Sequence, residues 1–267
     1  MSQPFQGLAR ASAAALIALC TLSLDALAAD AIRVGATPVP HADILNFIKP
    51  KLAAQGIELK VIEFSDYIQP NAALASGDLE ANYFQPIPYV ADQNKQHGYK
   101  LKIVAPVHLE PMGLYSKKIK SVKDIPDGAL IAVPNNPTNE GRALKVLEGA
   151  GLIRLKDGSS LHFTVLDIVD NPHKFKFVEL DPAQLPHALE DVAAGVINAN
   201  YALEAGLNPA RDAIAVESET SPFANVLVVR EGDENKPEIQ KLKAAITSPE
   251  VKAFIKEKYQ GGVIPTF

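Results

Sequence analysis

The sequence predicts an α/β protein of two lobes, in which strands alternate with helices. Short apolar stretches alternate with segments of helical periodicity along most of the chain, which is typical of parallel, helix-covered sheets. This pattern breaks once, around Glu110–Ser116, and then restarts. Ligands of such sheets bind outside the carboxyl ends of strands. Polar or aromatic residues lie at those positions in Thr37–His41, Tyr83–Tyr89, Asn135–Arg142 and Asn198–Tyr201.

The first series of elements starts with a strand at residues 31–36. The next segment, 41–55, has the spacing of an amphipathic helix with one apolar face, formed by Ile44, Leu45, Ile48 and Leu52. Gly56 ends this helix. The elements expected after it are a strand at 57–64, a short helix at 71–76, a strand at 79–84 and a strand at 101–109.

The second series starts with an apolar run at 129–133, which predicts a buried strand. Thr138 or Asn139 is a suitable N-cap for the following helix, which ends near Gly149 or Gly151. The remaining elements are expected as a loop or hairpin at 152–158, a strand at 177–180, a helix at 184–194, a strand at 195–201, a strand at 226–230 and helices at 237–246 and 249–259.

The N-terminal segment has the features of a secretory signal peptide. Arg10 precedes an apolar stretch that is short for a membrane span, and Ala26-Leu27-Ala28 fits the small-x-small cleavage rule. A signal peptide at 1–28 predicts an exported, periplasmic protein that begins at Ala29. The alternative is a lipid anchor at Cys20, the only cysteine, but the large Leu19 before it fits a lipoprotein signal poorly.

Composition and motifs argue against several classes of function. The 267 residues carry a formal net charge of −5 without a basic run, so no nucleic-acid partner is expected. The chain has no Gly-x-Ser-x-Gly elbow, phosphate-binding loop, dinucleotide fingerprint or His-Glu-x-x-His motif. Its six histidines do not have metal-ligand spacing. We therefore expect no catalytic residues, no cofactor and no metal.

The segment from Asn135 to Leu144 has the pattern of an anion receptor. It follows a buried strand and opens a helix that carries Arg142 in its first turns, close to Asn139. Free backbone N–H groups at a helix start attract anions, and an arginine fork holds a carboxylate through two hydrogen bonds. The alternative is an ordinary strand–loop–helix connection with a surface arginine.

Aromatic residues cluster in the segment 82–89, which contains Tyr83, Phe84 and Tyr89. Two prolines in the same segment predict a stiff loop. One interpretation is a preformed pocket wall for an apolar ligand group, and the other is core packing beneath a loop. Tyr67, at another strand end, is a weaker candidate for the same wall.

Two asparagines stand at predicted strand ends, Asn198 after one strand and Asn225 before another. A zwitterionic amino acid needs hydrogen-bond acceptors for its ammonium and donors for its carboxylate, and an asparagine amide supplies both. Together with Arg142 they would satisfy such a ligand. The alternative is turn formation, which is a common role of asparagine.

Several strings resemble the methionine-binding substrate-binding proteins of ABC importers, the MetQ/NlpA family. They are Asn82–Gln85, Glu110–Ser116, Pro134–Leu144, Gly151–Ile153, Val178–Leu180, Val196–Leu207 and Ser221–Asn225, and the likeness covers nearly all of the mature chain. The resemblance implies a two-lobed periplasmic-binding-protein fold, type II-like, that closes on an amino acid and docks on a membrane permease.

The resemblance also implies roles for individual residues. Arg142 would pair with the ligand carboxylate, Asn198 and Asn225 would hold the ammonium and carboxylate, and Tyr67 and Phe84 would line the thioether pocket. Crossings between lobes would fall near Glu110-Pro111 and Ser221–Asn225. One lobe would then comprise 31–110 plus 225–267, and the other would comprise 111–224.

Two positions depart from the family pattern. One is Leu19 before Cys20, because many relatives are lipid-anchored, and the other lies in the ligand pocket. Family members usually read Phe-Gln-His where this chain reads Phe84-Gln85-Pro86. That histidine belongs to the pocket for the ligand side chain, and proline has neither its hydrogen bonds nor its shape. The departure concerns the side chain of the ligand and leaves amino-acid binding as the expectation.

The sequence therefore predicts an exported solute-binding protein rather than an enzyme. It would capture L-methionine, a closely related amino acid or a methionine dipeptide, and deliver it to the permease–ATPase complex of an ABC importer. Two alternatives stay open. One is an exported enzyme that uses carboxylates in the same cleft, and the other is an adhesin-like or signalling protein with no role in transport.

Overall fold

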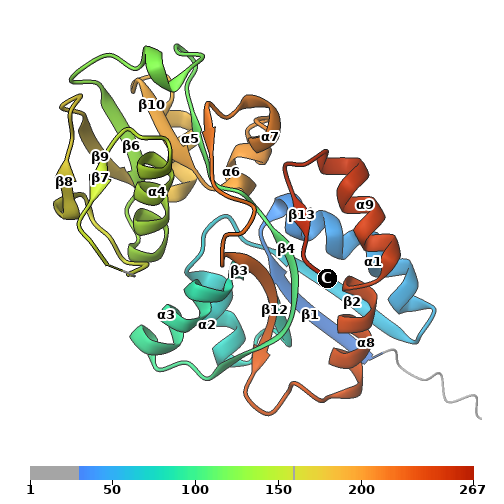
Figure 1. Ribbon diagram of the computed structural model, residues 1–267. Helices are drawn as coiled ribbons and strands as arrows, with labels where there is room; N and C mark the ends of the chain where they lie inside the picture. Colours follow the sequence, from blue (N-terminus) through green and yellow to red (C-terminus); the bar gives the residue numbers. More distant parts are fainter. Residues whose placement is uncertain (1–29, 159) are drawn as a thin grey trace, which may run out of the picture.

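The computed structural model describes residues 30–158 and 160–267 (Figure 1). The signal peptide expected at 1–28, its cleavage site and Cys20 lie outside the described residues. Two separate sheets form the two halves of the molecule, and helices cover both faces of each sheet (Figure 1). The two-lobed α/β fold expected from the sequence is confirmed.

The first sheet has six strands in the order β13-β4-β12-β3-β1-β2. Their bounds, in the same order, are Ile264–Pro265, Leu101–Leu109, Ala224–Arg230, Ala81–Pro86, Asp30–Ala36 and Ile57–Glu63. Strand β1 pairs in parallel with β2 and β3, whereas β12 runs antiparallel to both of its neighbours. The sheet is therefore mixed, and the sequence-based expectation of a parallel sheet holds only for part of it.

Both faces of this sheet are covered by helices, because its central strands are apolar on both sides. Leu227 and Val229 of β12 face a core shared with α1, α8 and α9, while Val226 and Val228 face a core that includes residues of α2 and α3. The bounds of these helices are α1 Asp43–Ala53, α2 Gln69–Ser76, α3 Ile87–His97, α8 Pro237–Ile246 and α9 Pro249–Tyr259.

The second sheet has five strands in the order β11-β5-β10-β6-β9, with bounds Ala215–Val216, Gly113–Tyr115, Ala194–Ile197, Leu130–Pro134 and Lys176–Leu180. Ile131 and Val133 of β6 pack with α4, and Ala132 between them lies in the core on the side of α5 and α6. The helices of this half are α4 Pro137–Gly149, α5 Leu185–Ala188, α6 Ala199–Glu204 and α7 Pro209–Asp212.

Smaller elements complete the described chain. Strands β7 (Arg154–Leu155) and β8 (Ile168–Asp170) form a two-stranded ribbon. The short helical turns are η1 Pro38–Ala42, η2 Val122–Asp124, η3 Val165–Asp167 and η4 Pro182–Gln184. The chain passes between the two sheets twice, from β4 to β5 through 110–112 and from β11 to β12 through 217–223.

Two elements differ from the sequence-based expectation near the strand ends. The segment expected as a stiff loop at 82–89 continues β3 to Pro86 and then begins α3 at Ile87. Pro88 falls in the first turn of that helix, where the missing N–H of proline has no intrahelical partner to lose. Strand β10 ends at Ile197, and residues expected to extend it form α6 instead.

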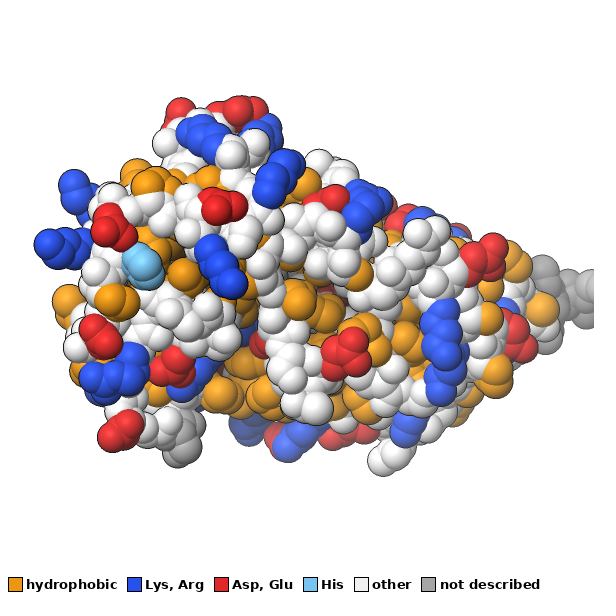
Figure 2. All heavy atoms as spheres, turned by 45° about the horizontal axis from the view of Figure 1, so that its top comes forward, with side chains coloured by type: hydrophobic (Ala, Val, Ile, Leu, Met, Phe, Trp, Pro, Cys, Tyr) orange, Lys and Arg blue, Asp and Glu red, His pale blue; other side chains and the backbone are white. Residues whose placement is uncertain are grey.

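No helix of the described part of the chain is long and apolar enough to span a bilayer. Among the described side chains on the face drawn in Figure 2, positive and negative groups are interspersed, and neither sign forms an extended patch. That face therefore offers no surface suited to a polyanion.

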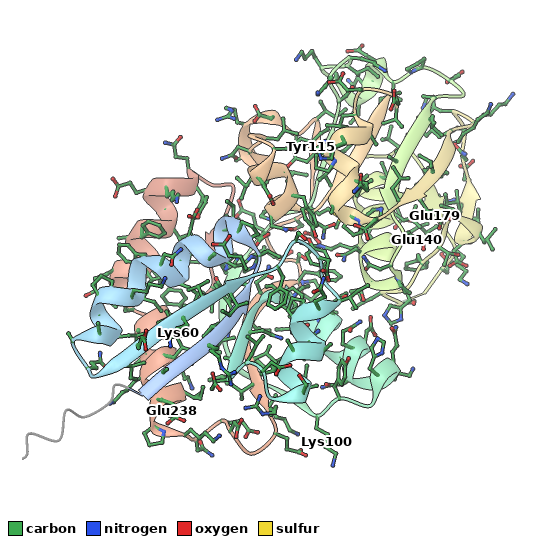
Figure 3. The ribbon with its side chains drawn as sticks, turned by 180° about the vertical axis from the view of Figure 1, so that it is seen from behind. Lys60, Lys100, Tyr115, Glu140, Glu179 and Glu238 are labelled. Atoms are coloured by element: carbon green, nitrogen blue, oxygen red, sulfur yellow. The ribbon has the colours of Figure 1, made fainter. Side chains whose placement is uncertain are left out.

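The contact between α4 and β9 includes two carboxyl groups, Glu140 and Glu179, which Figure 3 labels on neighbouring elements. Burial and a hydrogen bond with Glu179 raise the pKa of Glu140 to about 7. Glu140 is also fixed in place, because the backbone N–H of Val165 donates to it at 2.9 Å. The folded protein therefore binds a proton here that the unfolded chain releases near pH 4.5.

This raised pKa predicts a pH-dependent effect of Glu140→Gln. The stabilising contribution of the protonated carboxyl is complete below about pH 4.5 and is lost as the pH rises through about 7. Glutamine keeps the neutral, hydrogen-bonding form at every pH. We expect the variant to match the wild type at pH 5 and to be more stable at pH 8 by roughly 1–2 kcal/mol, after allowance for solvent screening.

Urea unfolding at the two pH values measures this difference. Glu148→Gln on the same helix is a matched control, because Glu148 pairs with Lys145 at 2.8 Å and should lose stability at pH 8 instead. An equal effect of Glu140→Gln at pH 5 and pH 8 would contradict the shared proton.

Candidate ligand-binding site

A cavity of about 320 Å³, including space open to solvent, lies between the two sheets. Both halves of the molecule contribute to its wall. Its lining residues are Tyr67, Phe84, Gln85, Pro86, Tyr89, Glu110, Asn139, Arg142, Asn198, Ala199, Asn200 and Asn225. They come from the loop after β2, the carboxyl ends of β3 and β10, the starts of α3, α4, α6 and β12, and the first crossing. The location agrees with the rule that ligands of open α/β sheets bind beyond the strand ends.

The start of α4 brings two of the sequence-predicted residues to the cavity. Asn136 is the N-cap, because its side chain accepts a hydrogen bond from the backbone N–H of Asn139, and Pro137 follows at the first helical position. The expectation of Thr138 or Asn139 as the cap was wrong. Asn139 and Arg142 are three residues apart on this helix and so lie on the same side of it, and both line the cavity.

The guanidinium of Arg142 is already engaged by the protein. Nε and Nη2 donate to the carboxylate of Glu217, with the Nη2–Oε2 distance at 2.5 Å, and Nη2 also donates to the carbonyl of Glu110 at 2.6 Å. The ring of Phe223 lies under the guanidinium, 4.5 Å from its central carbon. The guanidinium that the sequence predicts to bind a ligand carboxylate therefore binds the carboxylate of Glu217. Among the described residues, Nη1 has no hydrogen-bond partner.

The pair of Arg142 and Glu217 is buried, with side chains exposed by 4% and 11%. Burial opposes ionisation of Glu217, but the adjacent guanidinium outweighs it and lowers the pKa of that carboxyl. Glu217 also accepts from Ser221 at 2.7 Å and from the backbone N–H of Met112 at 3.1 Å. It therefore ties α4 to both crossings between the sheets.

Asparagine amides supply unpaired polar atoms to the cavity. Asn198 donates through Nδ2 to Asn139 Oδ1 at 2.9 Å, and its own Oδ1 is buried without a partner among the described residues. Asn200 accepts from the Tyr67 hydroxyl at 2.6 Å, and its Nδ2 is likewise buried and unpaired. Asn200 was not among the site residues predicted from the sequence, because its position was assigned to a strand. One acceptor and one donor are thus left for a ligand.

Aromatic rings form the apolar part of the cavity wall. The centroid of Tyr67 lies 6.1 Å from those of Phe84 and Tyr89, and Pro86 adds a further apolar surface. Tyr83 does not belong to this wall. Neighbouring residues of a strand point to opposite faces, so the Tyr83 ring is fully buried beneath the sheet and its hydroxyl contacts His108.

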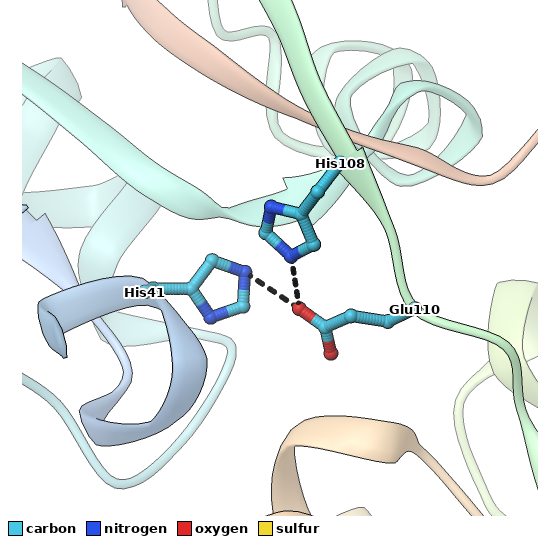
Figure 4. A group of neighbouring side chains, drawn as sticks. All are labelled: His41, His108 and Glu110. Atoms are coloured by element: carbon cyan, nitrogen blue, oxygen red, sulfur yellow. Dashed lines mark hydrogen bonds and ion pairs between the residues drawn. The ribbon is translucent and has the colours of Figure 1, made fainter. Parts of the chain in front are cut away.

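Glu110, in the first crossing, joins two buried histidines that sequence spacing does not connect (Figure 4). Its Oε1 lies 2.6 Å from His108 Nε2 and 3.0 Å from His41 Nε2. Their Nδ1 atoms contact the hydroxyls of Tyr83 and Thr37. Burial opposes ionisation of Glu110, but His41 and His108 outweigh it and hold the pKa of the carboxyl well below its usual range.

Among the described residues, these three side chains also form a group that could hold a metal ion. Their ligand atoms lie within 4.8 Å of one another. The expectation of no metal site rested on spacing along the chain, which did not reveal this group. In the structure His108 Nε2 contacts the carboxylate alone, whereas His41 Nε2 lies between the carboxylate and Asn225 Oδ1, which is 3.3 Å away. Each Nδ1 has a hydroxyl partner, so hydrogen bonds within the protein engage all four ring nitrogens.

The two halves of the molecule touch around the cavity. Thr138 of α4 donates to Asp92 of α3 at 2.5 Å, and His162 lies 2.7 Å from the same carboxylate. The Tyr201 hydroxyl donates to the carbonyl of Ser65 at 3.0 Å, near the contact of Tyr67 with Asn200. The structure is therefore closed over the cavity.

Comparison with known proteins agrees with this arrangement. A probable D-methionine-binding lipoprotein, MetQ, of Vibrio cholerae is 41% identical over 256 residues, which are 95% of this chain and 95% of that protein. A solved structure of a nutrient-binding protein from Burkholderia cenocepacia bound to methionine is 50% identical, with a TM-score of 0.86, and covers 88% of this chain and 100% of its own.

A second solved structure, the periplasmic substrate-binding protein of an ABC transporter from Coxiella burnetii, is 45% identical with a TM-score of 0.84 over 88% of this chain and 100% of its own. These relatives are binding proteins and not enzymes, which removes the support for an exported enzyme. The sequence model of the NlpA lipoprotein family matches residues 32–267, and the chain belongs to this family.

Proposed function

We propose that this protein is an exported solute-binding protein that captures L-methionine, a closely related amino acid or a methionine dipeptide, and delivers it to an ABC importer. The observation that carries the proposal is the cavity between the two sheets, with an aromatic wall on one side and unpaired polar atoms on the other. The names of the relatives from Vibrio cholerae and Burkholderia cenocepacia support methionine as the first ligand to test.

The polar atoms explain why a ligand would stabilise the closed state. Asn198 Oδ1 and Asn200 Nδ2 are buried without partners among the described residues, and each such atom costs about 1–3 kcal/mol. A zwitterionic amino acid carries the complementary donors and acceptors. Its binding would recover this cost only when both halves surround it, so the ligand would bind the closed state more tightly than the open one.

The apolar wall suits a side chain without charge. Tyr67, Phe84 and Tyr89 surround the space, and Pro86 stands where family members usually have a histidine. Proline has no N–H to donate at this position. We therefore infer that packing against the aromatic rings, rather than a hydrogen bond, selects the ligand side chain.

Ligand release would require the two halves to separate. We assign residues 31–110 plus 225–267 to one lobe and 111–224 to the other, with hinges near Glu110-Pro111 and Ser221–Asn225. Closure would follow the hinge motion of binding proteins, and the contacts of Asp92 with Thr138 and His162 would form in the closed state. We propose a periplasmic location after removal of 1–28, with a lipid anchor at Cys20 as the alternative.

Calorimetry on refolded, ligand-stripped protein tests the proposal. We expect methionine to bind with a Kd tighter than about 0.1 mM, which corresponds to roughly −5.5 kcal/mol. Leucine, alanine and a methionine dipeptide form a comparison series for the side-chain pocket. A failure of every amino acid and dipeptide to reach this affinity would exclude the proposed function.

A further inference from the structure

Glu110 is a carboxylate on the cavity wall that the family resemblance did not assign. It stands at the end of β4, where the chain first passes between the sheets, and its side chain is 5% exposed. A buried carboxylate is costly unless its oxygens are paired. The partners of each oxygen therefore indicate what the residue does.

The two oxygens of Glu110 have different surroundings. Oε1 takes both histidine contacts, at 2.6 Å from His108 and 3.0 Å from His41. No described residue makes a hydrogen bond to Oε2, which points away from both imidazole rings in Figure 4. The histidines thus orient the carboxylate and leave one oxygen free on a residue that lines the cavity.

The hydrogen-bond network indicates that this free oxygen is a negatively charged hydrogen-bond acceptor. His108 Nε2 lies 2.6 Å from Glu110 Oε1, and its Nδ1 contacts the Tyr83 hydroxyl, so both ring nitrogens are engaged within the protein. Two histidine nitrogens lie within 3.0 Å of Oε1, and such contacts favour the charged form of a carboxyl group over the neutral form. The free oxygen, Oε2, therefore brings negative charge to the wall of the cavity.

The cavity also holds a second acceptor, the unpaired and buried Oδ1 of Asn198. A primary ammonium group has three N–H donors and no acceptor, so it needs surroundings of this kind. The buried, unpaired donor of the cavity, Asn200 Nδ2, suits a carboxylate instead. The polar part of the wall is thus divided between acceptors for a cation and a donor for an anion.

We propose that Glu110 is the counter-ion of the ligand's ammonium group, and that it restricts the site to ligands with a free, protonated primary amine. The inference rests on the proposed function, since it concerns the same cavity. It adds a specificity for the amine end of the ligand that neither the aromatic wall nor Arg142 provides.

The test compares methionine with its 2-hydroxy analogue, in which a hydroxyl replaces the ammonium at nearly the same size. Both are titrated by calorimetry into wild-type protein and Glu110→Gln. Glutamine keeps an oxygen for the two histidines but removes the charge. We expect the wild type to bind methionine at least about 100-fold more tightly than the hydroxy analogue, and Glu110→Gln to lose about 100-fold in methionine affinity.

The variant should also discriminate less than about tenfold between the two compounds, because the preference for the amine depends on the charge. Glu58→Gln is the matched control, since its carboxylate is 55% exposed on β2, and it should bind like the wild type. Thermal unfolding of each variant checks that the fold is retained.

The outcomes separate this inference from the proposed function. Wild-type protein that binds methionine and its hydroxy analogue equally would overturn the role of Glu110 alone, without need of a variant. The same conclusion follows if Glu110→Gln keeps both the affinity and the discrimination of the wild type, since Glu110 would then only hold the histidines in place. Wild-type protein that binds no amino acid would overturn the proposed function and this inference with it.

Discussion

Arg142→Ala is expected to lower the free energy of unfolding of the ligand-free protein by about 3–5 kcal/mol. The reason is the buried pair with Glu217, in which the guanidinium and the carboxylate are exposed by only 4% and 11%. Removing the cation leaves the Glu217 carboxylate buried with hydrogen bonds from Ser221 and Met112 alone. Urea unfolding of the stripped protein measures the loss.

The double variant Arg142→Ala/Glu217→Ala separates the two roles of the arginine. It removes the uncompensated carboxylate, so we expect it to recover part of the lost stability. Affinity for methionine should stay weaker by a few kcal/mol in both variants if Nη1 contacts the ligand. A single variant as stable as the wild type would show that Glu217 finds other compensation, and an unchanged affinity would remove Arg142 from the ligand site.

Gly141→Ala is expected to have the second large effect, a loss of about 3 kcal/mol or more in the free energy of unfolding. Gly141 lies inside α4, where alanine ordinarily stabilises a helix by roughly 1 kcal/mol relative to glycine. Here a Cβ would stand 2.1 Å from the carbonyl oxygen of Leu161 and 2.8 Å from the backbone nitrogen of Phe163. Neither atom belongs to a flexible side chain, so the segment or the helix must move.

Gly149→Ala is a matched control on the same helix. A Cβ at Gly149, the last residue of α4, meets nothing within 4 Å, so we expect no loss and a gain of up to about 1 kcal/mol. Thermal or urea unfolding of the two variants should shift in opposite directions. Equal shifts would mean that the approach of 161–163 to α4 does not restrain the helix.

Since α4 positions Asn139 and Arg142, methionine affinity should fall with Gly141→Ala as well.

The elements that the sequence predicted correctly are those with strong local periodicity. Strand β1, strand β6 and helix α1 bury continuous or regularly spaced apolar residues, and such patterns depend only on neighbours a few positions away. The same holds for the chemistry of the strand ends, where Phe84, Asn198 and Arg142 were chosen because polar and aromatic residues followed apolar runs. Each of these residues lines the cavity.

The boundaries that failed have a local physical reason too. Pro86 and Pro88 suggested a loop, yet one ends a strand and the other sits in the first turn of α3, where proline is well tolerated. Asn200 was assigned to a strand because Gly195–Tyr201 is mostly apolar, although α6 begins at Ala199. A signal of a few residues does not distinguish these conformations, and tertiary packing decides between them.

By itself, the sequence determined a two-lobed α/β chain of the MetQ/NlpA type and most of the residues that surround its cavity. The tertiary structure alone decided the partners of those residues. It paired Arg142 with Glu217, 75 positions away, and joined His41 to His108 through Glu110. It also turned Tyr83 into the core while Phe84 faces the cavity. Local periodicity shows which residues are apolar or polar, but pairs distant in sequence depend on how the two sheets and their crossings pack, which no local pattern records.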